Sequence, residues 1–393
     1  MADSTFARPP AVLMIGTGEY TTGYTVEGAS KSDKKTGVVA LVMLDLQLRG
    51  KVGTLGMCGT DGLKMPAIRA HMKSVLSGYA GIDPSRIQTW PADGVVNHKA
   101  YLEAAEAFGP GDCAIIFTPD DTHGRIASAC LARGMHVMIT KPPVKTLAEH
   151  LALVAEARKV NRLAVVEVHK RFDPIYADAR DRIASSLGGF SFFTAHMSQP
   201  KHQLDTFRAW AGRSSDISYY LNSHHVDFHE WCMRGMARAE TTDDGAQDGA
   251  SSAPDGFTGS AGHAIYTSSW VAPKSDVHSQ QRWFYMGTRG EINVDQAHRG
   301  YTMATDEGGF ASVNPLFWKP AKDAATHAFA GQRCYGYLSF EAFIEAAAAC
   351  NEVGATAILE AGRRSLDSGG RPIEIVYDDV AAETPRAIRQ VEY

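Results

Sequence analysis

The apolar and polar positions follow two different patterns along the chain. Up to about residue 170, short apolar runs alternate with longer segments whose apolar positions repeat at helical spacing. The strands expected there are residues 11–15, 51–58, 113–117, 136–139 and 163–168, and the expected helices are 37–49, 66–76, 125–133 and 147–159, of which 37–49 has an amphipathic pattern. Strands that alternate with helices in this way predict α/β structure, a doubly wound parallel sheet with helices on both faces.

After about residue 175 the pattern changes. Segments 190–196, 264–271, 282–286 and 291–295 are typical of strands without intervening helices. They predict a second domain of α+β type, built on a large, mostly antiparallel sheet, so that residues 1–170 and 171–393 form two domains. Residues 237–260 are rich in Gly, Asp, Ser and Thr and predict a mobile surface loop. Segments 337–350 and 356–365 are helical in pattern, and these final helices could pack back on the first domain.

Composition and charge remove several classes of function. The chain has 44% hydrophobic and 21% charged residues, as globular proteins do, and a net charge of −5 gives no reason to expect nucleic acid or an anionic membrane as partner. Residues 1–10 contain no apolar stretch suited to a signal peptide, and no later stretch approaches a membrane span. The six cysteines have no CxxC spacing, so we expect a cytoplasmic protein with reduced thiols and no metal site.

A glycine pair follows the first expected strand. Gly16 and Gly18, separated by Thr17, can adopt unusual backbone angles and let N–H groups approach a pyrophosphate. The third glycine of a GxGxxG pattern arrives two positions late, at Gly23, and the polar stretch 30–36 delays the helix. The position at the first strand of an alternating chain predicts a dinucleotide site. Its expected lining residues are Gly16, Thr17, Gly18 and Tyr20.

The end of the second strand bears on the choice between NAD and NADP. An NAD site usually has a carboxylate there, about 20 residues after the glycines, to bind the ribose hydroxyls. Here the strand ends in Gly59 and Thr60, with Asp61 one position late and Lys64 and Arg69 beyond it. A hydroxyl and cations suit a 2′-phosphate, so Gly59, Thr60 and Lys64 predict that NADPH is preferred over NADH. The alternative is that Lys64 and Arg69 only cover a solvated helix face.

Several motifs occur in an order that resembles the glucose–fructose oxidoreductase/inositol dehydrogenase (Gfo/Idh/MocA) family. They are residues 118–123 (TPDDTH), 132–137 (ARGMHV), 140–142 (TKP), 171–176 (RFDPIY) and 287–292 (GTRGEI). The resemblance runs from about residue 11 to 377. It implies a Rossmann domain and a sheet domain whose open face commonly forms dimers, hence a homodimer or higher oligomer. It also implies that Thr118, Pro119 and His123 line the nicotinamide side, with Thr140 and Lys141 at the cofactor and Lys141 at the reacting carbon.

The resemblance also implies a catalytic pair on one helix. The family has D-x-x-x-H there, whereas this chain has Tyr220 in place of the carboxylate, followed by His224. Residues four apart share a helix face, so both side chains can bind one substrate. We expect His224 to carry the proton, because histidine titrates near neutrality, and Tyr220 to orient the substrate, although either could be the acid. Thr140 replaces the glutamate of the family's EKP motif, which removes a carboxylate beside Lys141.

Cations and tryptophans suggest the substrate. The cations that should face the cleft are 169–171, 201–202 and Arg208, with Arg213 nearby, and Trp210, Trp270, Trp283 and Trp318 offer flat faces to sugar C–H groups. Arginines suit a carboxylate, so Arg171 and Arg208 favour a hexuronic acid such as galacturonate or glucuronate, reduced by NADPH. Lys141, Tyr220 and His224 are the other expected substrate contacts. The alternatives are an aldose or inositol dehydrogenase, an NAD-assisted glycosidase, and a non-catalytic NADPH-sensing protein.

Overall fold

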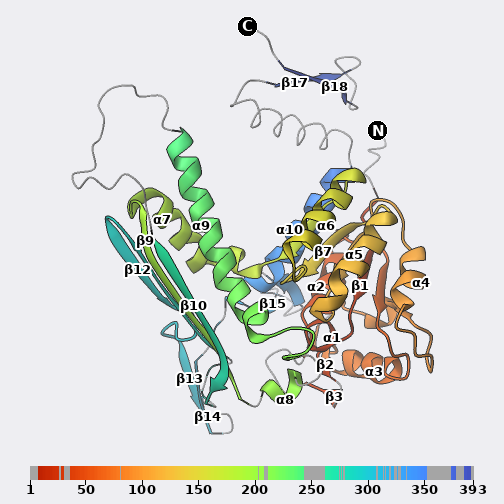
Figure 1. Cartoon of the computed structure of the whole chain (residues 1–393). Coiled ribbons are helices and arrows are strands. Elements are labelled where there is room, and N and C mark those ends of the chain that lie inside the picture. Colours follow the sequence, from red (N-terminus) through yellow and green to blue (C-terminus); the bar gives the residue numbers. More distant parts are fainter. Residues whose placement is uncertain are drawn as a thin grey trace.

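A computed structural model places two units beside each other, a sheet with helices on both faces and a second sheet with two helices over one face (Figure 1). The residues that it describes are 8–25, 28–30, 36–79, 81–201, 203–207, 211–242, 262–273, 275, 277, 279–306, 309–312, 314, 316–317, 320–322, 325, 329–332, 334–351, 373–377 and 385–390. Within these ranges no helix is both long enough and apolar enough to cross a membrane.

The first sheet has six parallel strands in the order β5-β4-β1-β6-β7-β8. Their bounds are β1 (Val12–Ile15), β4 (Leu55–Cys58), β5 (Gln88–Trp90), β6 (Cys113–Ile116), β7 (His136–Thr140) and β8 (Ala164–Glu167). This order confirms the predicted Rossmann sheet. The order reverses between β1 and β6, and sheets of this kind bind their ligands at the carboxyl ends of the strands beside that point.

Side chains that alternate along the strands build a core on each face of this sheet. Val12 and Met14 pack toward α2 (Val39–Leu48), α3 (Met65–Val75) and α10 (Tyr335–Asn351). Leu13 and Ile15 pack toward α4 (Ala100–Glu106), α5 (His123–Ala132) and α6 (Leu147–Lys159). The helix α10, near the carboxyl end of the chain, therefore lies on the first sheet, whereas the expected helix at 356–365 lies outside the described residues.

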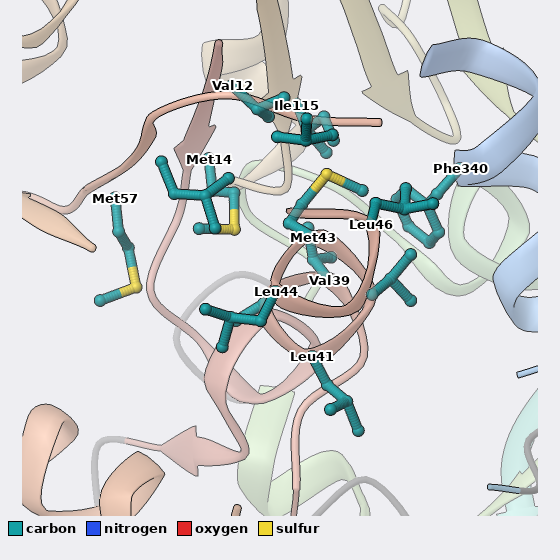
Figure 2. Close-up of a cluster of buried hydrophobic side chains, with 14 of the residues drawn as sticks. Val12, Met14, Val39, Leu41, Met43, Leu44, Leu46, Met57, Ile115 and Phe340 are labelled. Atoms are coloured by element: carbon teal, nitrogen blue, oxygen red, sulfur yellow. The ribbon is translucent and has the colours of Figure 1, made fainter. Parts of the chain in front are cut away.

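The helix α2 is buried on every side, so its predicted amphipathic character is wrong. All residues from Val39 to Leu46 are buried, including Asp45. Figure 2 shows side chains of α2 directed to several sides, with Val12 of the sheet near some of them and Phe340 of α10 near others. The covering helix α10 comes about 290 positions later in the chain, so local periodicity could not reveal it. The carboxylate of Asp45 accepts a hydrogen bond from Tyr337 Oη of α10 at 2.5 Å.

The helix that should follow β1 is split. The short helix α1 (Glu19–Thr22) ends at Gly23, and a hairpin of β2 (Tyr24–Thr25) and β3 (Gly28–Ala29) follows before α2 begins. The backbone N–H of Val38 donates to the carbonyl of Tyr20 at 2.8 Å. In an uninterrupted α-helix that carbonyl would accept from residue 24. The inserted residues therefore leave the helix and return to it at adjacent points.

The second sheet has the order β10-β9-β11-β12, in which only the pair β9 and β10 is parallel. Its strands are β9 (Phe190–Pro200), β10 (His263–Ala272), β11 (Gln280–Gly287) and β12 (Gly290–Asp295). The mostly antiparallel sheet is confirmed, although it has four strands in the described residues. The expectation of no intervening helices is wrong, because a parallel pair needs a crossover. That crossover contains α8 (Gln203–Phe207), the π-helical turn η4 (Ser218–Asn222) and α9 (Ser223–Thr242).

One face of the second sheet is covered by α7 (Pro174–Ser186) and α9. Tyr176 of α7 and Phe228 of α9 pack there against Trp283 of β11. Because α9 continues to Thr242, residues 237–242 are helical and not part of a surface loop, and 243–260 lie outside the described residues. The remaining short elements are η1 (Pro84–Arg86), η2 (Asp120–Thr122), η3 (His169–Phe172), β13 (Thr302–Thr305), β14 (Gly309–Ser312), β15 (Pro320–Lys322), β16 (Phe329–Gln332), β17 (Ile373–Tyr377) and β18 (Pro385–Gln390).

Candidate active site

The glycine turn after β1 lies where the expected dinucleotide site should be. Gly16 has a φ of +111°, and a Cβ there would lie 1.9 Å from the carbonyl oxygen of Phe117, so no other residue fits. A Cβ on Gly59, after β4, would lie 2.9 Å from Thr17 Oγ1. The predicted residues of the turn and of the end of β4 are thus brought together. Tyr20 stacks on the ring of Phe117 at 5.0 Å.

The cations beyond β4 lie near carboxylates. Lys64 Nζ is 3.7 Å from Asp61 Oδ2. Arg69 donates through Nη1 to Asp93 Oδ1 at 3.0 Å, and a second bond joins the same two side chains. The Arg69 guanidinium is therefore bound to Asp93, and of these two cations Lys64 is the less closely paired.

His123 joins the loops that follow β6 and β7. Its Nε2 lies 2.8 Å from the carbonyl oxygen of Thr118, and its Nδ1 lies 2.8 Å from the carbonyl oxygen of Pro142. The side chain is fully buried. These contacts tie the Thr118–Pro119 turn to the Lys141–Pro142 turn, so His123 is suited to holding the two loops in register.

Lys141, directly after β7, contacts Tyr220. Its Nζ donates to the backbone carbonyl of Tyr220 and lies 4.1 Å from the centroid of the Tyr220 ring. That ring also contacts Phe207 at 5.1 Å and stacks on Trp270 at 5.8 Å. Three aromatic side chains thus gather beside the ammonium group. Tyr220 lies in the π-helical turn η4 and His224 in the α-helix α9, so the spacing of four residues along a single α-helix does not describe this pair.

His224, in the first turn of α9, is only 5% exposed. Burial, and next the charge of Lys141, hold its pKa well below the usual range for histidine, and Lys170, His169 and His225 act in the same direction. Among the described residues its Nδ1 has no hydrogen-bond partner. A histidine with this pKa is neutral at neutral pH, so it is better suited to accepting a proton from an alcohol than to donating one.

A buried carboxylate that sequence reasoning missed lies beside the lysine. Glu167 of β8 pairs in register with Thr140 of β7, next to Lys141. Its Oε1 accepts a hydrogen bond from Ser339 Oγ at 3.0 Å, and both carboxylate oxygens lie 3.2 Å from His169 Nδ1. The carboxylate that the sequence appeared to lose at position 140 is therefore present on the neighbouring strand. The available signal was a charged residue at the carboxyl end of a predicted buried strand.

The cations at 169–171 are directed to different surroundings. Lys170 is buried, donates to Gln281 Oε1 at 2.6 Å and to Gln296, and lies 5.0 Å from the ring centroid of Tyr176. Burial lowers the pKa of Lys170 to about 7. Arg171 donates to both oxygens of Asp227, at 2.9 and 2.6 Å. Arg171 is therefore already paired with a carboxylate, and Arg208, like His202, Trp210 and Trp318, lies outside the described residues.

The described histidines, cysteines and carboxylates contain no group of three or more that could hold a metal ion. What gathers at the carboxyl ends of β1, β4, β6 and β7 is instead the glycine turn, the Thr118 loop and Lys141, with Tyr220 and His224 reaching this edge from the second unit. Such a set suits a bound dinucleotide and a proton transfer beside it.

Comparison with known proteins agrees with this arrangement. Residues 51–168 match the model of an oxidoreductase family with an NAD-binding Rossmann fold, GFO_IDH_MocA. Over 181 residues, 45% of this chain and 51% of the relative, the chain is 29% identical to the uncharacterized oxidoreductase YdgJ of Escherichia coli K12. Over 188 residues, 40% of this chain and 52% of the relative, it is 30% identical to inositol 2-dehydrogenase 1 of Saccharopolyspora erythraea. The chain thus spans about half the length of these curated relatives.

Solved structures share the fold over nearly the whole chain. Myo-inositol 2-dehydrogenase from Lactobacillus plantarum superposes with a TM-score of 0.52 at 14% identity, covering 92% of this chain and 98% of that one. GenD2 from gentamicin A biosynthesis, in complex with NAD, gives a TM-score of 0.52 at 15% identity, covering 93% of this chain and 96% of that one.

Proposed function

We propose that this chain is an oxidoreductase of the Gfo/Idh/MocA family, whose model residues 51–168 match. In this proposal it transfers a hydride between a nicotinamide dinucleotide and a carbon of a small cyclic polyol or sugar. The observation that carries the proposal is that Lys141, directly after β7 at the carboxyl edge of the sheet whose β1 leads into the glycine turn, acts with its charge on the buried His224. Gly16 lets the turn pack directly on the Phe117 carbonyl, and Gly18 has open space where a side chain would begin, which suits the close approach of a pyrophosphate to this backbone. A bound dinucleotide supplies the hydride acceptor or donor.

The chain's own residues supply the proton chemistry in this proposal. In the oxidation direction, the Lys141 ammonium donates a hydrogen bond to the substrate oxygen, in exchange for its present bond to the Tyr220 carbonyl. Neutral His224 accepts the hydroxyl proton as the hydride leaves the carbon. In reduction the same proton moves back to the oxygen. Lys141 then stabilises the charge that develops on that oxygen.

The surroundings of Lys141 favour a neutral ring substrate over a hexuronic acid. Phe207, Tyr220 and Trp270 provide apolar faces that suit the C–H groups of a sugar or cyclic polyol. A uronate needs a cation for its carboxylate, and Arg171 is already bound to Asp227. Relatives named inositol dehydrogenases point in the same direction. The hexuronate reductase reading therefore ranks second.

A substrate panel tests the proposal. The panel measures kcat/KM by nicotinamide absorbance for the oxidation of myo-inositol, scyllo-inositol, glucose and galactose with NAD⁺ or NADP⁺, and for the reduction of glucuronate and galacturonate. We expect at least one of the four neutral compounds to give a higher kcat/KM than either uronate. A uronate that exceeds every neutral compound would instead support hexuronate reduction. Release of nitrophenol from a nitrophenyl glycoside without added reductant would indicate a glycosidase. Tight NADPH binding without turnover of any carbonyl or alcohol would indicate a sensing protein.

We also propose that the cofactor is NADP, on the basis of Thr60 and Lys64 at the end of β4. NADPH is expected to bind about tenfold more tightly than NADH, about 1.4 kcal/mol, and Lys64→Ala to remove most of that difference, because the 2′-phosphate loses its cation. Fluorescence titration of both cofactors measures it. Asp61→Ala is the control, since Asp61 lies near Lys64 and could instead bind ribose hydroxyls. Equal or tighter NADH binding in the unmodified protein would contradict the proposal and favour NAD.

Self-association is a further part of the proposal. The face of the second sheet opposite α7 and α9 carries Phe192, Ile265, Phe284 and Met286, of which Ile265 is 47% and Met286 37% exposed. An apolar face of this kind suits pairing with a second copy. Sedimentation at micromolar concentration measures the assembly, and a purely monomeric protein would contradict it.

A further inference from the structure

One carboxylate lies among several positively charged or titratable groups in the candidate site. Glu167 is 2% exposed, so it is removed from water almost entirely. A buried carboxylate is stable only when charges and hydrogen bonds compensate for the lost hydration. Burial acts to raise the pKa of Glu167, but the charge and hydrogen bond of His169, the Ser339 hydroxyl and the charge of Lys141 together lower it. Glu167 is therefore ionised at neutral pH, inside the site.

Each neighbour of Glu167 comes from a different part of the fold. Lys141 follows the adjacent strand β7, and its charge acts on the carboxylate. His169 of η3 contacts both carboxylate oxygens through Nδ1, and the next residue, Lys170, adds a second buried amine. From α10, Ser339 donates its hydroxyl, and the ring of Tyr335 stacks on His169 at 5.8 Å.

The contact with His169 extends the influence of Glu167 to the proposed base. The His169 ring meets the ring of His224 edge to face, at 5.3 Å between centroids. A carboxylate beside Nδ1 fixes the position of the imidazole proton and the orientation of the ring. Glu167 therefore influences two neighbours. One is the charge of Lys141, and the other is the His169 ring, which packs against His224.

We propose that Glu167 is a positioning residue of this site, which keeps Lys141 in its ammonium form and holds the His169 ring against His224. The proposal rests on the proposed function for the roles of Lys141 and His224. Removing the negative charge takes away the carboxylate that acts on Lys141, whereas Asp173, the other buried carboxylate nearby, acts on Lys170 and is bound by Arg299. The ammonium then loses its proton at lower pH, because the opposite charge that favours its charged form is gone.

The test compares Glu167→Gln with Ser339→Ala in the full-length protein. Glutamine keeps the size of the side chain and can still accept from Ser339, but it carries no charge. Ser339→Ala removes the hydrogen bond at the same oxygen and leaves the charge in place. The lysine side chains are observed by NMR in protein labelled with ¹³C,¹⁵N-lysine. The signal that is present in the unmodified protein and missing from the spectrum of Lys141→Arg belongs to Lys141. We expect its titration midpoint to fall by about one pH unit or more in Glu167→Gln and to change little in Ser339→Ala.

Activity provides the second readout. In Glu167→Gln, kcat is expected to fall about tenfold, and the alkaline limb of its pH profile to move to lower pH, while KM and NADPH binding change little. Glu167→Asp should restore part of the alkaline limb. A Lys141 midpoint and an alkaline limb that are both unchanged in Glu167→Gln would overturn the proposal, even if its thermal stability falls. The NMR titration needs no substrate, so failure of the substrate panel would sink the proposed function without deciding this result.

Discussion

Replacing Lys141 with alanine is expected to lower kcat by about 10²-fold or more, the usual scale for a positioned group that acts on developing charge. The ammonium lies at the carboxyl end of β7 and now donates to the Tyr220 carbonyl, a bond that a substrate oxygen can replace. The glycine turn follows a different strand, β1, so the Kd for NADPH should change little. Steady-state kinetics and fluorescence titration measure the two quantities.

Lys145 provides a matched control for that substitution. Lys145 lies four residues after Lys141, and its Nζ donates to the carbonyl of Ser214 at 2.6 Å. This bond joins the two units through Ser214 and not through the aromatic group around Tyr220. Lys145→Ala should therefore lower kcat far less than Lys141→Ala. A Lys141→Ala protein that loses NADPH binding but turns over normally at saturation would show that Lys141 serves the cofactor and not the reacting oxygen.

The second large effect is expected at His224. His224→Ala should lower kcat for oxidation by about 10²-fold, since the proton acceptor is lost, whereas Tyr220→Phe keeps the ring beside Lys141 and should mainly raise KM. Parallel kcat and KM measurements on both variants separate these roles. A collapsed kcat in Tyr220→Phe beside a nearly normal His224→Ala would reverse them. His229→Ala is the control, because His229 lies further along α9 and bonds to Tyr266 Oη at 2.6 Å.

The pH dependence of the unmodified protein follows from the same histidine. The neutral form is the active base in oxidation, and burial, with the charge of Lys141, holds the pKa of His224 well below its usual range. The acidic limb of kcat should therefore lie well below pH 6.5, the ordinary value for histidine. Burial also lowers the pKa of His225, to about 3. As the pH falls, both histidines therefore bind protons at a higher pH in the unfolded chain than in the folded protein. Their contribution to stability is present above about pH 6.5 and is lost as the pH falls below it.

Much of the first unit could be predicted because its signals are local. A few neighbouring residues are enough to recognise its features, which are the glycine pair after β1, the alternation of strands with helices, and the turns at Thr118 and Lys141. The second unit is harder to predict from the sequence. The parallel pairing of β9 with β10 depends on a crossover of more than 60 residues, and no short pattern specifies it.

Charged residues gave the least reliable predictions, because their partners are distant in sequence. Arg171 looked suited to a substrate carboxylate, but it pairs with Asp227, which lies 56 positions away. Glu167 stands within the expected strand 163–168, where nothing local distinguishes it, and its partners include Ser339, 172 positions away. Only the folded chain brings such pairs within a few ångströms, so spacing along the sequence cannot separate a paired surface arginine from a binding residue.

The bond from Val38 to Tyr20 has a consequence for how this fold can vary. Because the inserted chain leaves and re-enters the helix at adjacent points, its ends are already closed by the helix itself. Doubling the length of such a closed excursion costs only about 0.6 kcal/mol in chain entropy. The register of α2 against the sheet is therefore set by its bond to α1 and by its own packing, so the length of the connection between Gly23 and Gly37 can vary while the dinucleotide turn stays in place.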